Sequence, residues 1–230
     1  MKYYQVSVSA EPKIIGVNNG IYQLEIDEKA IEYSDDYDEF KAHFKYGNKE
    51  FWNNQDKVKT LRPPTIKGKM LKKAKVTDIM GYAPEYTFLN NLYSEKYLDI
   101  IKSFEIVDYK SFEIEIDEIM SRFYLVFFKK ILLSEIHFKN SVIYTGHKKI
   151  GNVKYFPISN YEEYNSFKIE NPLHSFEKIS ISNNYSNKDI ISIQATGGNF
   201  YSERLIDFLL DCGITGLQVA YNTSIQLEFG

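Results

Sequence analysis

Histidine and carboxylate side chains are the first groups in this chain to test for metal chemistry. The four histidines lie far apart in the sequence, and no two of them have a ligand spacing such as i, i+4 on a helix. They are His43, His137, His147 and His174. Glu135 and His137 would share one face of a strand, which a pair of surface residues explains equally well. The pattern predicts no metal and no cofactor, and a metal site would have to be assembled by the fold alone.

Nucleophile and phosphate-binding patterns are also weak. Ser94 and Ser202 lack the Gly-x-Ser-x-Gly surroundings of a nucleophile elbow, and a helix-capping role already explains them. Cys212 falls on an apolar helical stripe, where a buried structural thiol is expected rather than a reactive one. The segment ATGGN at 195–199 precedes a helix but lacks the Gly-Lys-Ser/Thr ending of a phosphate-binding loop. We therefore predict that the chain is not an enzyme, and we assign no catalytic residue.

One segment does have the composition of a protein-binding surface. Acidic side chains are mixed with aromatic ones after residue 32, and such a mixture suits a basic partner protein. We predict seven partner-binding residues, namely Tyr33, Asp35, Asp36, Tyr37, Asp38, Glu39 and Trp52. The alternative is a solvated loop, because residues 34–60 are polar and are predicted to be loop with one helical turn.

The elements that could position such residues include a phrase that the chain carries twice. NLYSEKYLDIIKSFEI begins at Asn91, and NFYSERLIDFLLDCGI begins at Asn199. In each copy apolar residues recur at i, i+4 and i+7, which predicts amphipathic helices over 94–104 and 202–212. Each helix has a Ser at its N-cap and a Glu in its first turn, and Gly213 can end the second one in the left-handed conformation. The copies predict two related strand–helix–strand units, produced by duplication or by coincidence.

Most of the remaining sequence is rich in residues that favour strands. The chain holds 19 Tyr and 16 Phe, both typical of pleated, half-buried surfaces. Strands are predicted at 2–9, 21–26, 112–116, 122–130, 142–146, 153–158, 178–182, 190–194, 217–221 and 224–229. The first two should pair as a hairpin after a turn at 18–20, and 159–168 should form a short helix capped by Ser159 or Asn160. Strands and helices do not alternate regularly, so the fold class is α+β with mostly antiparallel sheet.

Length and composition limit the number of domains that the chain can form. Its 230 residues, 43% of them hydrophobic, suit one large domain or two small lobes. The softest boundary lies at 80–90, around the Gly and Pro residues there. We divide the chain into an N-terminal β-rich lobe at 1–85 and an α+β region at 86–230, with one continuous domain as the alternative.

Charge and cysteine content limit which classes of partner and which cellular location are expected. The net charge is only −3, and just three of the 28 basic residues are arginines, so no nucleic-acid partner is expected. No run of 18 apolar residues and no signal-peptide core is present, so no membrane association is expected. With a single cysteine no internal disulfide can form. These features predict a cytoplasmic protein.

The second phrase and its continuation resemble a family of bacterial proteins. YSERLIDFLLDCGITGLQV at 201–219 is similar to a motif that ends a class of immunity proteins, which are found beside polymorphic or contact-delivered toxins. The similarity is clearest at Ser202, Glu203, Arg204, Leu205, Leu209, Gly213, Thr215 and Gly216. YSEKYLDIIKSF at 93–104, followed by RFYLVFF, resembles the middle of such proteins. The resemblance implies a non-enzymatic protein that binds and neutralises a cognate toxin, and it identifies no functional residue.

Our leading expectation is an immunity protein that acts in interbacterial competition by steric occlusion of a toxin. One alternative is a small cytoplasmic enzyme, for which a pocket joining His137 or His147 with carboxylates would be the sign. Another is a structural or adaptor protein that uses its sheet edges. The sequence leaves the oligomeric state open.

Overall fold

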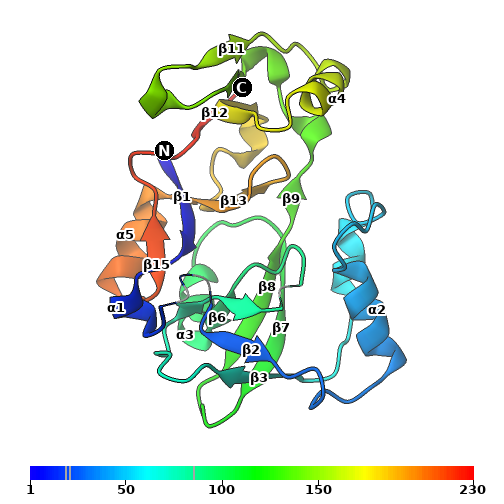
Figure 1. The fold of residues 1–230 in the computed structure, drawn as a ribbon, viewed down its shortest axis with the longest axis vertical. Coiled ribbons are helices and arrows are strands. Elements are labelled where there is room, and N and C mark those ends of the chain that lie inside the picture. The colour runs from blue at the N-terminus through cyan, green and yellow to red at the C-terminus, as the bar shows by residue number, and fades with distance from the viewer. Residues whose placement is uncertain (19, 21, 85) are drawn as a thin grey trace. The chain divides into compact units, whose positions relative to one another are not determined.

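The computed structural model describes every residue of the chain except 19, 21 and 85. The fold is α+β and its sheets are largely antiparallel, as predicted. The described residues form five α-helices (Figure 1): α1 (Pro12–Ile15), α2 (Asp35–His43), α3 (Glu95–Ile101), α4 (Tyr161–Glu170) and α5 (Glu203–Asp211). They also form short 3-10 turns: η1 (Gln55–Lys59), η2 (Leu133–Glu135), η3 (Phe138–Asn140), η4 (Lys148–Ile150) and η5 (Asn183–Tyr185). No helix among them is both long and apolar enough to cross a membrane.

The chain folds into two compact units, each of which has its own hydrophobic core. Unit 1 comprises Met1–Val6, Lys130–Arg204 and Val219–Gly230, whereas unit 2 comprises Ser7–Lys129 and Leu205–Gln218. Both units are therefore built from segments that are distant in the sequence. The boundary that we placed after residue 85 falls inside unit 2.

Unit 2 contains a seven-stranded sheet with the strand order β4-β6-β8-β7-β3-β2-β5. Its strands are β2 (Leu24–Ile26), β3 (Ile66–Met70), β4 (Ile79–Met80), β5 (Tyr82–Ala83), β6 (Leu92–Ser94), β7 (Tyr109–Ile116) and β8 (Phe123–Phe128). The apolar run 122–130 forms β8, which lies between two other strands as such a run predicts. Helix α2 belongs to the same unit and packs on this sheet through Phe40, whose ring centroid lies 5.0 Å from that of Phe112 in β7.

A five-stranded sheet has the order β15-β1-β14-β13-β9. Its strands are β1 (Tyr3–Val8), β9 (Lys130–Ile131), β13 (Ile190–Ile193), β14 (Asn199–Ser202) and β15 (Leu217–Val219). The predicted hairpin between 2–9 and 21–26 is wrong, because β1 pairs with β14 and β2 pairs with β3 and β5. Pro12 begins a helical turn soon after β1, so the chain does not fold straight back on itself. The turn at 18–20 and the start of the strand at 21 include residues 19 and 21, which lie outside the described residues.

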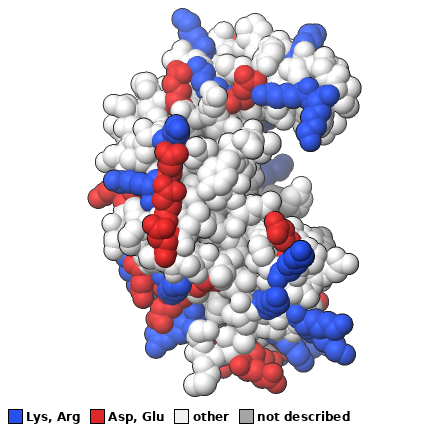
Figure 2. Space-filling view, turned by 90° about the vertical axis from the view of Figure 1, so that its left-hand side faces the viewer, with Lys and Arg blue, Asp and Glu red and all other residues white. Residues whose placement is uncertain are grey.

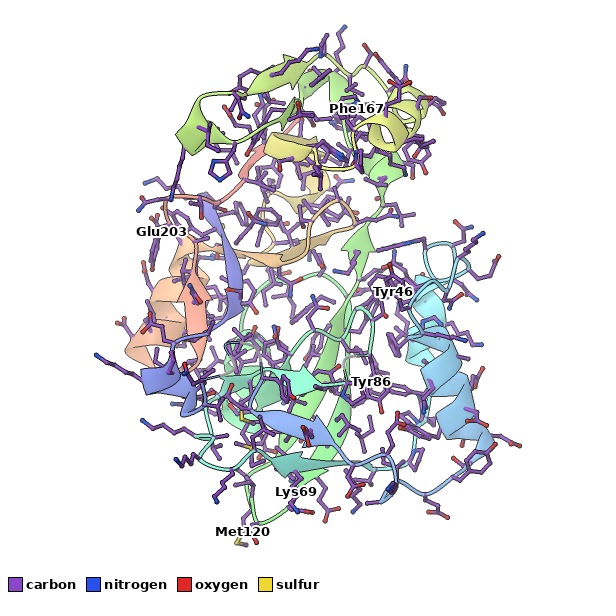
Figure 3. The ribbon with its side chains drawn as sticks, viewed as in Figure 1. Tyr46, Lys69, Tyr86, Met120, Phe167 and Glu203 are labelled. Atoms are coloured by element: carbon purple, nitrogen blue, oxygen red, sulfur yellow. The ribbon has the colours of Figure 1, made fainter. Side chains whose placement is uncertain are left out.

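The third sheet belongs to unit 1 and has the order β11-β10-β12-β16. Its strands are β10 (Val142–Thr145), β11 (Lys154–Phe156), β12 (Ser175–Ile181) and β16 (Gln226–Phe229). The predicted hairpin of β10 and β11 is confirmed. So is helix α4, which Asn160 caps by accepting the N–H of Glu163 at 2.9 Å. Phe167 (Figure 3) packs this helix against Phe156 with their ring centroids 4.8 Å apart.

The prediction that 34–60 is loop with one helical turn is wrong, because α2 occupies its first part. The side chain of Ser34 accepts the N–H of Tyr37 at 3.2 Å and caps the helix. The acidic residues after Ser34 stand at the positive end of the helix dipole, so they favour helix here. Tyr37, Phe40 and Phe44 are buried at i, i+3 and i+7, which is the helical signal that the polar composition conceals.

Candidate functional site

The seven predicted partner-binding residues lie on or near α2 in unit 2. Five of them are exposed, namely Tyr33, Asp35, Asp36, Asp38 and Glu39. Tyr37 is only 5% exposed, and its hydroxyl lies 2.8 Å from that of Tyr86, which Figure 3 shows between the sheet and α2. Trp52 is half-buried against Phe51 and Phe88. The structure therefore exposes the four carboxylates and Tyr33, whereas Tyr37 is buried and Trp52 is half-buried.

The carboxylates of this acidic face (Asp35, Asp36, Asp38 and Glu39) differ in how far they are compensated. Tyr33 donates its hydroxyl proton to Asp38 at 2.6 Å, and this hydrogen bond raises the pKa of the Tyr33 phenol. Glu39 forms an ion pair with Lys57 at 2.8 Å. Neither Asp35 nor Asp36 is in an ion pair within the described part of the chain. Figure 2 shows acidic and basic side chains interspersed over another side of the molecule.

His43 lies at the far end of α2 and is almost completely buried, with 5% of its surface exposed. Its ring packs against Phe44 and Phe51, and its Nε2 has no hydrogen-bond partner among the described residues. Burial is the main cause that lowers the pKa of the imidazole, and the nearby Lys57 lowers it further. The folded state therefore holds this histidine neutral.

We expect His43→Leu to reduce the loss of stability between pH 7 and pH 5. The unfolded histidine binds a proton below about pH 6.5, whereas the folded one binds it only at lower pH. The wild-type chain consequently loses stability as the pH falls through 6.5, and the variant lacks this contribution. Urea unfolding at both pH values measures the effect, and an unchanged difference between them would show that His43 titrates alike in both states.

Both twin phrases fold as predicted into a strand, a Ser and a helix, and the structure extends the repeat to further strands. Each phrase pairs antiparallel with a strand that follows an Asp, since Ile79 lies opposite Tyr93 and Ile190 lies opposite Tyr201. A strand from elsewhere in the chain lies on the other side of each phrase, β8 beside β6 and β1 beside β14. The orders β4-β6-β8-β7 and β13-β14-β1-β15 are therefore equivalent.

In the first copy, Asp78 accepts hydrogen bonds from two distant segments. Ser94 donates its hydroxyl to Oδ1 at 2.8 Å and also accepts the N–H of Tyr97 as the helix cap. Thr215, in the Gly-Ile-Thr-Gly stretch after α5, donates its N–H and hydroxyl to Oδ2 at 2.9 and 2.8 Å. Burial alone would raise the pKa of Asp78, but the hydrogen bonds from Thr215 and Ser94 outweigh it and the pKa is lowered. The carboxylate is held ionised as a structural acceptor.

In the second copy, the equivalent Asp189 is completely buried. Ser202 donates its hydroxyl to Oδ1 at 2.5 Å. Arg204 donates from Nε to Oδ1 and from Nη2 to Oδ2, both at 2.6 Å, which is a bidentate pair. The guanidinium thus takes the place at Asp189 that Thr215 takes at Asp78. Ser94 and Ser202 each donate their proton to a carboxylate, which fits positioning rather than nucleophilic chemistry.

A hollow of about 330 Å³ lies beside Asp78 in unit 2. Its charged lining residues are Asp78, Glu95, Lys96 and Arg122, so cationic and anionic groups are balanced there. No histidine lines it, nor either of the two other pockets described in unit 2. The juxtaposition of a histidine with carboxylates that would favour an enzyme is thus not found in these three pockets.

The remaining candidate groups have structural surroundings. His147 accepts the N–H of Lys149, and His174 lies between the Tyr164 hydroxyl and a backbone carbonyl. Glu135 belongs to the 3-10 turn η2, so it does not share a strand face with His137. In the described residues no group of three or more His, Cys, Asp or Glu could hold a metal ion. Cys212 is half-buried rather than fully buried.

Lys130 is a residue that the sequence pattern did not single out. It lies in β9 with its side chain buried, and its Nζ donates to the Ser192 hydroxyl at 2.9 Å. Burial lowers its pKa to about 8. The run 122–130 ends in Lys129 and Lys130, and its sequence does not show which of the two lysines is buried. Comparison of the sequence with models of protein families and with curated proteins finds no match.

Proposed function

We propose that this chain is an immunity protein that binds a cognate bacterial toxin in the cytoplasm and neutralises it by steric occlusion. The resemblance of the two phrases to immunity proteins supports this function. The observation that carries the proposed mechanism is the acidic face on α2, because its first turn exposes Asp35, Asp36 and Asp38. A toxin domain with a basic surface, such as a nuclease, is the partner that this face would fit best.

The acidic face is well suited to binding because its scaffold is firmly packed. Phe40 in α2 is completely buried, with its ring centroid 5.0 Å from those of Phe44 and Phe112. A helix anchored in this way loses little conformational entropy when a partner binds. Tyr33 is 78% exposed beside the carboxylates and can serve as an aromatic anchor within a polar rim.

We expect Asp35→Lys/Asp36→Lys to slow association with the toxin by about tenfold or more and to weaken the salt dependence of the association rate. Both carboxylates would steer a basic partner from a distance, and neither is in an ion pair that the substitution would break. The measurement is stopped-flow association with the purified product of the adjacent upstream reading frame, after co-expression has tested for a 1:1 complex.

The control for net charge is Glu170→Lys/Asp211→Lys, which reverses two exposed carboxylates at the ends of α4 and α5. Because the acidic residues also stabilise the start of α2, Asp35→Asn/Asp36→Asn should show an intermediate association rate and near-native circular dichroism. Equal rates for the two reversed variants would remove the acidic face from the interface, and failure to form any complex would remove the proposed function.

A further inference from the structure

The hairpin of β10 and β11 in unit 1 is a basic surface that the proposed function does not use. Residues 136–161 contain no Asp or Glu, although the whole chain has a net charge of −3. Lys148 forms an ion pair with Glu177 at 2.7 Å. Lys149 and Lys154 are exposed and are in no ion pair within the described part of the chain. We refer to residues 142–156 as the basic hairpin.

The outer strand of the basic hairpin is an edge of its sheet. β11 pairs with β10 on one side, and no backbone hydrogen bond joins its other side to a described residue. Tyr155 in this strand is 54% exposed, and Ile150 in the turn before it is 74% exposed. The edge therefore offers unused backbone donors and acceptors together with positive charge and apolar surface.

We propose that this edge binds an extended, acidic segment of another protein, which adds to the sheet as a further strand beside β11. Strand addition draws its affinity from backbone hydrogen bonds and its specificity from the side chains along the edge. Lysines on an edge strand discourage pairing with neutral strands. The same lysines attract a strand that carries Asp or Glu, and Ile150 provides an apolar contact for it. This site is separate from the acidic face and does not depend on the proposed function.

A nucleic acid would fit this surface less well than an acidic strand. The exposed Tyr155 and its cross-strand neighbour Tyr144, whose ring centroids lie 6.0 Å apart, would be the main stacking surface for bases. The carboxylate of Glu177 accepts the Tyr155 hydroxyl at 2.9 Å, so phosphates bound there would meet a negative charge. An added strand would draw its affinity from the backbone of β11 rather than from the groups around the Tyr155 hydroxyl.

Fluorescence anisotropy with a labelled short peptide of alternating Glu and Val tests the proposal on the full chain. We expect the peptide to bind and the binding to weaken as NaCl is raised. Lys149→Glu/Lys154→Glu should weaken it by about tenfold or more, and Lys149→Gln/Lys154→Gln should weaken it less. Lys49→Glu/Lys72→Glu, which reverses two exposed lysines of unit 2, should leave the affinity within about twofold.

Two further probes decide between strand addition and other modes of binding. A peptide with the same sequence but N-methylated at alternate residues lacks the backbone donors of one edge, and we expect it to lose binding. Retained binding of the methylated peptide, or no binding of the parent peptide, would overturn the proposal. So would tighter binding of oligothymidine that the same lysine reversal abolishes, because the surface would then belong to a nucleic acid.

Discussion

Arg204→Met is expected to lower the free energy of unfolding by about 3–5 kcal/mol at neutral pH. The substitution keeps an unbranched apolar stem but removes the guanidinium from a carboxylate that is completely buried. The Arg204 side chain is 54% exposed, but Asp189 is fully buried, so in the variant this carboxylate keeps the hydrogen bond from Ser202 and loses both of its charged donors. Urea unfolding at pH 7 measures the loss.

The cause of this loss can be separated from a general packing defect. Lys96→Met changes the equivalent position of the first copy, where the exposed ammonium lies 3.4 Å from the Gly213 carbonyl, and should cost under about 0.5 kcal/mol. Similar losses for the two variants would contradict a stabilising ion pair between Arg204 and the buried Asp189 carboxylate.

The twin helices could be predicted because all of their signals are local. Apolar spacing, an N-cap Ser and Gly213 lie within one short phrase, and the structure places α3, α5 and a positive φ at Gly213 accordingly. Helix α2 was missed because acidic residues dominate its composition, although the same residues stabilise a helix at its N-terminus. The pairing of β1 could not be predicted either, because its partner β14 lies almost the whole chain away.

The hydrogen bonds of Asp78 and Asp189 likewise could not be predicted from the sequence. Asp78 and Asp189 each precede an Ile and an apolar residue, but this pattern is too short to be distinctive on its own. Their function as acceptors depends on Thr215 and Arg204, which approach them only in the folded chain. For the acidic face, composition predicted the exposed carboxylates correctly, whereas the burial of Tyr37 follows from α2 and its contact with Tyr86.

Gly216→Ala is expected to destabilise unit 2 by about 3–5 kcal/mol and to release the segment after α5 from Asp78. Gly216 has φ +82°, and an added Cβ would lie 2.2 Å from the Ile79 carbonyl oxygen and 2.8 Å from Thr77 Oγ1. The first of these neighbours is backbone, so the strand or the segment must move. Such a movement breaks the bonds between Thr215 and Asp78 and the bond from the Ile79 N–H to the Thr215 carbonyl at 3.1 Å.

Gly213→Ala provides a matched comparison within the same Gly-Ile-Thr-Gly stretch. Gly213 also has a positive φ of +67°, but an added Cβ would meet nothing within 4 Å, so only the backbone cost of about 1–2 kcal/mol applies. Hydrogen exchange distinguishes the two outcomes, because the amides of Ile79 and Thr215 should lose protection in Gly216→Ala and retain it in Gly213→Ala. If both variants retained protection, a close approach at Gly216 would not hold this segment in place. The conformation of the Gly-Ile-Thr-Gly stretch would then be set by the turn after α5 alone. The hydrogen bond between Ser94 and Asp78 would not depend on Thr215.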